Sequence, residues 1–378
     1  MRRTQVKAAL AALAVTATLL PGAADAATAP GATAVPKPAP AVPAKAHTAG
    51  RVEVAGGSMR YSWPGVYFEG RFRGNGVGIA IDDAVNDYDV QVDGATVATL
   101  VTPGRTTYWV RNLSHGVHSV RLVKRTESPW SAGRFDGFVA APGGAILPRP
   151  ADRRRQIEFI GDSYTAGYGN MSATRDCPAP GQIDRNTNAD VSFGALTAHG
   201  LGADYQINAF SGRGMVRNYN GIEPGTDYRT YYDRALIGVS GDVWKNPGTW
   251  HPQLIVIGLG INDFSTAINP GEPWTPESLV AAYTTAYHGF IDKLRARYGK
   301  RAIIVVSATY MSNTTAFADA ARQIVQDRND QGDDRVRFWY YDNTDLDYGG
   351  CDWHPSAHDH EIISRRLDDF IATLPLRW

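Results

Sequence analysis

Five short segments in the second part of the chain are apolar at nearly every position, a pattern that strands tolerate only when both faces of their sheet are covered. They are residues 156–160, 205–209, 254–258, 302–307 and 336–340. Helical patterns lie between them. One helix is predicted to begin at Pro276, after the capping residue Thr275, and to stop at Gly299, and the last helix to begin at Ser356. This alternation predicts an α/β domain with a five-stranded parallel sheet over residues 153–378.

Residues 48–148 follow a different period. Polar and apolar side chains alternate in residues 77–81, 88–92 and 117–122, and glycine-rich turns separate these segments. No helical pattern interrupts them. Regular strand spacing with such turns predicts an antiparallel β-sandwich, which we expect to be a separate domain in front of the α/β part.

The first 47 residues are predicted to lie outside both domains. Residues 1–26 have a positively charged start, an apolar stretch from Leu10 to Leu20 and a small-x-small cleavage site that ends at Ala26, the three parts of a secretory signal peptide. An uncleaved anchor is the alternative, although the stretch is short for a membrane span. Residues 27–47 are mostly Ala, Pro and Thr and predict a linker that belongs to neither domain. We therefore expect a protein secreted to the extracellular space.

Charge and cysteine content exclude some classes of protein. The 38 Lys and Arg side chains balance 38 Asp and Glu side chains, whereas nucleic-acid binding needs a clustered basic surface. After the first 26 residues, no apolar stretch approaches the length of a membrane span. Cys177 and Cys351 are the only cysteines, and an even pair in an oxidising compartment predicts one disulfide, with two unpaired buried thiols as the alternative. We expect no nucleic-acid partner and no membrane partner, and the sequence does not indicate an oligomeric state.

Polar clusters follow the first three predicted strands of the parallel sheet, where such sheets bind their ligands. Residues 161–164 (Gly-Asp-Ser-Tyr) follow the first strand, residues 211–214 (Ser-Gly-Arg-Gly) the second and residues 258–263 (Gly-Leu-Gly-Ile-Asn-Asp) the third. A fourth cluster, residues 351–356 (Cys-Asp-Trp-His-Pro-Ser), lies just before the last helix. The sequence therefore predicts that these four clusters share one site at the sheet edge.

These four motifs in this order resemble the SGNH (GDSL) hydrolases. The resemblance extends into the sandwich, because residues 124–127 (Lys-Arg-Thr-Glu), 157–163 and 167–169 (Gly-Tyr-Gly) are similar to carbohydrate esterase family 2. That family pairs a jelly-roll domain with a three-layer α/β/α SGNH domain and removes O-acetyl groups from plant polysaccharides. The resemblance, from about residue 51 to the end, implies this fold, an acetylated polysaccharide or oligosaccharide as substrate, such as xylan or glucomannan, and no cofactor.

Acyl transfer needs an activated hydroxyl and a base that takes its proton. Ser163 is the candidate nucleophile, because the turn after the first strand presents it at the sheet edge. His354 is the candidate base, because its ordinary pKa near neutrality lets it both accept and return a proton. A turn serine and a structural histidine are the alternatives. Asp162 is expected to stabilise the loop by hydrogen bonding.

The resemblance also implies the donors that stabilise the negative oxygen of the reaction. They are the backbone N–H groups of Ser163 and Gly212 and the side-chain amide of Asn262. One sequence leaves open whether Gly212 or Gly214 donates, and whether Asn262 instead ties down its own loop.

The residue that orients the base departs from the general SGNH pattern. Most SGNH hydrolases carry an aspartate three residues before the histidine, and here that position is Cys351. Asp352 lies two residues before His354, and in an extended segment these two side chains would project to the same side. We therefore expect Asp352 to orient the base, although some members of the esterase family resemble serine–histidine dyads with a backbone carbonyl in place of the acid.

Aromatic residues near the motifs are expected to bind sugar rings. Trp353, Tyr164 and Tyr168 are the candidates, together with Trp250 and Trp274, although each one alone is more often a packing residue.

Other functions have weaker support. His354, His358 and His360 do not form a recognised metal motif, so we expect no metal. A lipase-type SGNH hydrolase for longer acyl esters is the enzymatic alternative, and a non-catalytic polysaccharide-binding protein is the alternative from another class.

Overall fold

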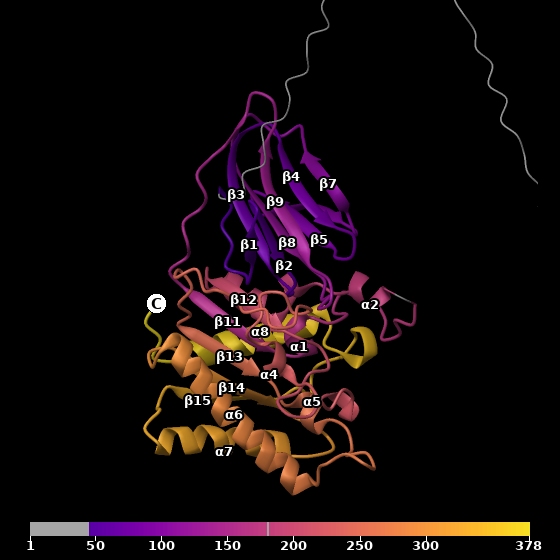
Figure 1. The fold of residues 1–378 in the computed structure, drawn as a ribbon, viewed down its shortest axis with the longest axis vertical. Coiled ribbons are helices and arrows are strands. Elements are labelled where there is room, and N and C mark those ends of the chain that lie inside the picture. Colours follow the sequence, from indigo (N-terminus) through magenta and orange to yellow (C-terminus); the bar gives the residue numbers. More distant parts are fainter. Residues whose placement is uncertain (1–44, 180) are drawn as a thin grey trace, which may run out of the picture. The chain divides into compact units, whose positions relative to one another are not determined.

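The structure is a computed structural model that describes residues 45–179 and 181–378, so the predicted signal peptide and most of the predicted linker lie outside the described residues. Figure 1 shows a β-sandwich, in indigo to magenta, followed along the chain by a parallel sheet with helices, in magenta to yellow. Within the described part of the chain, no helix has the length and apolar character needed to cross a membrane.

The sandwich consists of two antiparallel five-stranded sheets. In order across the first sheet, the strands are β1 (Glu53–Ala55), β2 (Ser58–Tyr61), β9 (Gly133–Ala140), β4 (Val77–Asp83) and β7 (Gly104–Val110). In the second sheet they are β10 (Ala145–Ile146), β3 (Tyr67–Gly74), β8 (Gly116–Lys124), β5 (Tyr88–Val92) and β6 (Ala95–Leu100). Alternate side chains of each sheet point into the shared core, where the rings of Phe68 and Phe135 stack with centroids 4.2 Å apart. The predicted sandwich is confirmed.

The second part of the chain forms the predicted five-stranded parallel sheet. Its strands, in order across the sheet, are β12 (Asp204–Ala209), β11 (Gln156–Gly161), β13 (Leu254–Gly258), β14 (Ile303–Thr309) and β15 (Val336–Tyr341). Its long helices are α3 (Phe193–Gly200), α6 (Pro276–Tyr298), α7 (Ala316–Asp330) and α8 (Ala357–Ala372), and its short ones are α1 (Ser163–Ala166), α2 (Gln182–Arg185), α4 (Tyr228–Tyr231) and α5 (Ile261–Phe264). Ile255 and Ile257 of β13 pack in the cluster of α6 and α7, whereas Leu254 and Val256 pack in that of α3 and α8. Each strand is thus buried on both faces, which explains its unbroken apolar sequence.

The predicted helix boundaries are confirmed by their capping bonds. The Thr275 side chain accepts a hydrogen bond from the Ser278 N–H, and α6 ends at Tyr298 with Gly299 as its C-cap. Ser356 and Asp359 form a reciprocal capping box at the start of α8. This cap fixes the point where the chain leaves the motif at residues 351–356 and enters the last helix.

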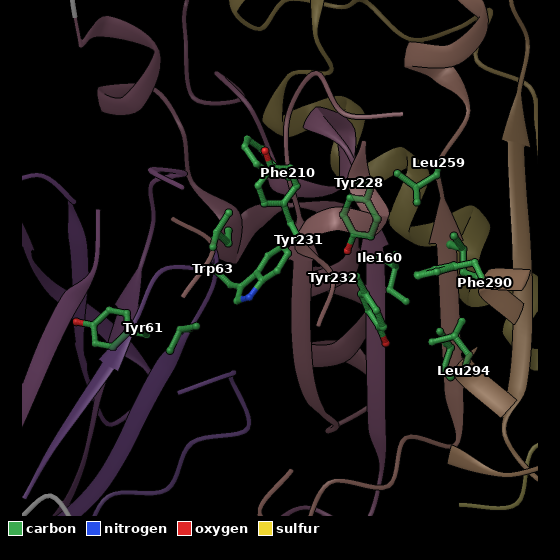
Figure 2. Packing of buried hydrophobic residues seen from close by; sticks show 14 of the residues in the cluster. Tyr61, Trp63, Ile160, Phe210, Tyr228, Tyr231, Tyr232, Leu259, Phe290 and Leu294 are labelled. Atoms are coloured by element: carbon green, nitrogen blue, oxygen red, sulfur yellow. The ribbon is translucent and has the colours of Figure 1, made fainter. Parts of the chain in front are cut away.

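The sandwich and the α/β domain share a buried polar boundary. Arg51 lies in the segment before β1, and its guanidinium pairs with Glu158 of β11 at 2.8 Å although both side chains are fully buried. Trp63 lies beside the tyrosines of α4 (Figure 2) and donates a 2.9 Å hydrogen bond to the Arg234 carbonyl. Because buried charges are costly to separate from their partners, these contacts hold the two domains against each other.

The prediction that the linker continues to residue 47 is wrong at its end. His47 is 1% exposed, forms a β-bridge with Glu69 and contacts Asp204 of β12 at 2.9 Å. The Lys45 ammonium donates a hydrogen bond to the Ile146 carbonyl. Residues 45–47 thus belong to the folded part of the chain. Composition alone assigned His47 to a linker, but its side chain binds Asp204 of the α/β domain.

Candidate active site

The first three motifs meet because three parallel strands end at the same edge of the sheet. Gly161 at the end of β11 lies opposite Ala209 of β12 and Gly258 of β13. The chain then turns sharply into α1, and a Cβ on Gly161 would lie 2.0 Å from the Thr165 hydroxyl, so the turn needs glycine. Asp162 caps α1 by accepting a hydrogen bond from the Tyr164 N–H, which agrees with the predicted loop role.

Ser163 and His354 lie within hydrogen-bond distance, although 191 residues separate them. The Ser163 hydroxyl oxygen is 2.8 Å from Nε2 of His354. The other ring nitrogen, Nδ1, lies 3.0 Å from the Cys351 carbonyl and 3.2 Å from the Asp352 carbonyl, so it carries the proton and donates. Burial lowers the pKa of His354, which keeps the imidazole neutral and leaves Nε2 able to accept the serine proton.

The prediction that the Asp352 carboxylate orients the base is wrong. Its oxygen accepts a 2.8 Å hydrogen bond from the Tyr168 hydroxyl, while backbone carbonyls hold the imidazole. The prediction assumed an extended segment, but residues 351–353 form a 3₁₀ turn in which Asp352 and Trp353 both have positive φ. In that turn the i and i+2 side chains do not project to one side.

The loop after β12 presents a backbone donor beside this pair. Gly212 has φ of +75°, and its N–H donates to no protein group in the described ranges 45–179 and 181–378. The Gly214 N–H, in contrast, donates to the Asn218 side chain at 3.3 Å. Of the two glycines that the sequence left open, the arrangement therefore favours Gly212 as a donor to a bound molecule.

The Asn262 amide lies between the first two motifs. Its Nδ2 is 3.0 Å from the Arg213 carbonyl and 3.3 Å from the Asp162 carboxylate, so the amide is oriented by groups from the segments that follow β12 and β11. Burial raises the pKa of Asp162 to about 7. The four sequence motifs thus converge at one edge of the sheet.

Two carboxylates that organise this edge were not predicted. Asp263 accepts hydrogen bonds from the backbone N–H groups of residues 215–217 at 2.8–2.9 Å and so holds the far side of the β12 loop. The Asp of the Asn-Asp motif was a signal for it. The second carboxylate, Glu127 of the sandwich, accepts a hydrogen bond from the Ser211 N–H. No signal in the sequence indicated this contact between two distant segments.

The aromatic candidates differ in their surroundings. The ring centroids of Tyr168 and Tyr164 lie 4.3 and 5.7 Å from the His354 ring. Trp353 is 65% exposed, and the Arg175 guanidinium lies 3.9 Å from its ring centroid. Trp250, in contrast, is 2% exposed in the core, so its prediction as a sugar-binding residue is wrong.

Trp274, the last aromatic candidate, is half-buried and lines two grooves along α6. The structure does not bring it to the serine–histidine pair.

The predicted disulfide is confirmed. Cys177 and Cys351 are bonded, and their Cα atoms are 5.6 Å apart. The bond ties the loop after α1 to the segment that carries His354, where the Asp352 N–H also donates to the Arg175 carbonyl at 2.8 Å. Cys351 packs directly against Gly169. A Cβ added at Gly169 would lie only 2.3 Å from the Cβ of Cys351.

The other two histidines of the C-terminal region do not share this site. His360 is buried in α8, where it accepts a hydrogen bond from the Phe193 N–H, and burial lowers its pKa to about 3. His358 is exposed. Among the described residues, no group of three or more His, Cys, Asp or Glu side chains is arranged to hold a metal ion.

A serine and a neutral histidine at the carboxyl edge of a parallel sheet define a hydrolase of the GDSL type, and residues 157–367 match the GDSL-like Lipase/Acylhydrolase family. Residues 48–150 match the family described as Carbohydrate esterase 2 N-terminal. The chain therefore belongs to carbohydrate esterase family 2 and is a carboxylic ester hydrolase.

Known members of the family resemble the chain over most of its length. An acetylxylan esterase / glucomannan deacetylase of Cellvibrio japonicus is 39% identical over 337 residues, 86% of this chain and 90% of the relative. A solved carbohydrate esterase whose active site displays divergent catalytic and non-catalytic binding functions is 39% identical, with a TM-score of 0.80, and the match covers 88% of this chain and 98% of that one. A family two carbohydrate esterase from Clostridium thermocellum, solved in complex with cellohexaose, is 30% identical, with a TM-score of 0.74, covering 86% and 98% of the two chains.

Proposed function

We propose that this chain is a secreted serine esterase that removes O-acetyl groups from plant cell-wall polysaccharide, such as xylan or glucomannan, through an acyl-enzyme on Ser163. The observation that carries the proposal is the 2.8 Å contact between the Ser163 hydroxyl and Nε2 of His354. The names of the relatives support the substrate class, because one is an acetylxylan esterase / glucomannan deacetylase and another was solved with cellohexaose.

The first half of the reaction transfers the acetyl group to the enzyme. Ser163 Oγ attacks the acetyl carbonyl carbon while Nε2 of His354 takes the hydroxyl proton. The carbonyls of Cys351 and Asp352 accept hydrogen bonds from the Nδ1–H and stabilise the imidazolium that forms. The bond to the sugar oxygen then breaks, and that oxygen leaves as a hydroxyl with the proton from Nε2.

The second half returns the enzyme to its starting state. A water molecule gives its proton to Nε2 and attacks the acetyl carbon, and Ser163 leaves with that proton as acetate is released. In both halves the carbonyl oxygen becomes negative. The N–H groups of Ser163 and Gly212 and the Asn262 amide are the donors that stabilise it in this proposal.

We assign substrate binding to the aromatic side chains around His354. Trp353 presents an exposed ring next to the base, and one side of that ring rests on Arg175. Aromatic faces of this kind stack on sugar rings. Tyr164 and Tyr168 form the wall beside the imidazole and would contact the acetylated residue itself.

The test is acetate release from acetylated xylan, acetylated glucomannan and simple sugar acetates. We expect Ser163→Ala to lose at least about 10³-fold of the wild-type kcat. Ser240→Ala, which changes an exposed serine in the loop after α4, is the matched control and should retain wild-type activity. An organophosphonate should label the wild type and Ser240→Ala but not Ser163→Ala. Full activity in Ser163→Ala would refute the mechanism, and activity that rises from acetate to octanoate esters would refute the deacetylase assignment.

A further inference from the structure

The connection between β8 and β9, residues 125–132 of the sandwich, contacts the loop that carries the Gly212 N–H. The Glu127 carboxylate accepts a 2.6 Å hydrogen bond from the Ser211 backbone N–H. Its second oxygen accepts a bond from the Ser211 hydroxyl. One side chain of the sandwich thus satisfies both donors of the residue directly before Gly212.

Ser211 and Gly212 are the two central residues of a turn, which the Arg213 N–H closes by donating a 3.2 Å hydrogen bond to the Phe210 carbonyl. On its N-terminal side, the Phe210 N–H donates to the Gly161 carbonyl at 3.0 Å, and on its C-terminal side the Gly212 carbonyl accepts from Tyr219 at 2.9 Å. Gly212 has positive φ, which glycine adopts readily at the third position of such a turn. The direction of the Gly212 N–H depends on the peptide plane that Ser211 shares with it. Glu127 holds Ser211 in place together with the bond that closes the turn.

The same connection supports the loop a second time. The Trp130 ring packs edge-on against Phe210, with centroids 5.8 Å apart, and against Tyr231, at 6.0 Å. Contacts from the sandwich therefore lie on both Phe210 and Ser211, the two residues that lead from β12 to Gly212.

The surroundings of Glu127 are unusual for a residue that only joins two domains. Among the described residues, no Lys, Arg or His side chain forms an ion pair with its carboxylate, and the nearby Lys124 ammonium donates to the Thr126 carbonyl instead. Burial raises the pKa of the Glu127 carboxyl. A half-buried carboxylate without a cation is costly, unlike the paired carboxylates elsewhere on the domain boundary, such as Glu69 with Arg153.

We propose that Glu127, although it belongs to the sandwich, is a positioning residue of the esterase site: by holding both donors of Ser211, it aims the Gly212 N–H at the position of the negative oxygen. The proposal rests on the proposed function of Ser163. It makes the sandwich a working part of the active site rather than a separate binding module.

The test compares two full-length variants that each remove one carboxylate of the domain boundary. Glu127→Gln has nearly the same shape but leaves only one acceptor for the two donors of Ser211. Because complete loss of one oxyanion donor costs about 10²–10³ in kcat, a donor that is only misaligned should cost about 10- to 10²-fold, with KM for 4-nitrophenyl acetate changed less than about two-fold. Glu69→Gln weakens the boundary near the start of β12, away from the site, and should keep the wild-type kcat.

Each outcome has one meaning. A wild-type kcat in Glu127→Gln, a kcat loss in Glu69→Gln as large as that in Glu127→Gln, or a rise in KM that accounts for the whole loss would overturn the proposal. If Glu127→Gln does not fold, Ser211→Ala, which removes the hydroxyl bond alone, replaces it and should lower kcat with KM unchanged. A wild-type chain that neither hydrolyses the ester nor reacts with an organophosphonate would instead overturn the proposed function itself.

Discussion

Tyr168 donates a 2.8 Å hydrogen bond to the carboxylate of Asp352, the acidic residue nearest in sequence to His354. The Asp352 carboxylate therefore bonds Tyr168, and the Nδ1–H of the His354 imidazole donates to the backbone carbonyls of Cys351 and Asp352. A backbone carbonyl carries no net charge, so it orients the base and stabilises the imidazolium less strongly than an aspartate would. Burial also disfavours the charged imidazolium and so lowers the pKa of His354. The site is a serine–histidine pair supported by the backbone.

Replacement of Asp352 tests this arrangement. We expect Asp352→Asn to lower kcat for 4-nitrophenyl acetate by less than about 10-fold, whereas the same change in a serine–histidine–aspartate triad costs about 10⁴-fold. Tyr168→Phe, which removes the hydroxyl and keeps the ring, is the matched control and should behave similarly. A loss of about 10³-fold or more in Asp352→Asn would mean that its carboxylate reaches the imidazole during the reaction.

The Asn262 amide is expected to act on the reacting oxygen. Its removal in Asn262→Ala should lower kcat by about 10²–10³-fold with a small change in KM, because the donor is needed only where negative charge develops. Asn313→Ala is the control, since the Asn313 amide also donates to two acceptors, the carbonyls of Phe264 and Ser265, but lies outside the site. Equal losses in the two variants would assign Asn262 to loop structure.

The pH dependence of kcat/KM should report the lowered pKa of His354. The base works only when neutral, and burial favours the neutral form, so activity should persist as the pH falls below the ordinary histidine value of about 6.5. The acidic limb should therefore have its midpoint below about 6.5. Burial raises the pKa of Asp162 to about 7, so this carboxyl could also titrate in the same range. The variant Asp162→Asn removes that titration, and the acidic limb should persist in it. A midpoint at or above the ordinary value would contradict the burial of the base.

Removal of the disulfide should affect both stability and catalysis. The bond joins residues 174 positions apart, and the chain-entropy relation gives such a cross-link about 5 kcal/mol of stability. We expect Cys177→Ala/Cys351→Ala to unfold at a clearly lower temperature. It should also lose about 10-fold in kcat, because the turn that presents the carbonyls to His354 is loosened. Circular dichroism melting and initial rates measure the two effects. Reduced wild-type protein should behave like the variant, and an unchanged kcat would show that the turn holds without the bond.

Local sequence signals were sufficient wherever a structure depends on near neighbours. The unbroken apolar segment 254–258 became β13 with the same bounds, because a strand buried on both faces needs an apolar residue at every position. The caps at Thr275 and Ser356 predicted where α6 and α8 begin, since a cap is a contact between residues three apart. The motifs after the strands met at one edge because parallel strands share their direction.

Contacts between distant segments could be decided only by the tertiary structure. The partner of the His354 ring depends on a turn with two positive φ values, which the disulfide to Cys177 and the Arg175 carbonyl hold in place. The burial of Trp250 and the capture of His47 likewise depend on surfaces contributed from elsewhere in the chain. The sequence by itself therefore determined the strands, the helices and the edge of the sheet where the four motifs meet. The folded chain decided which atoms hold the His354 ring and which sandwich residue contacts the loop that carries Gly212, because both choices depend on contacts with distant segments.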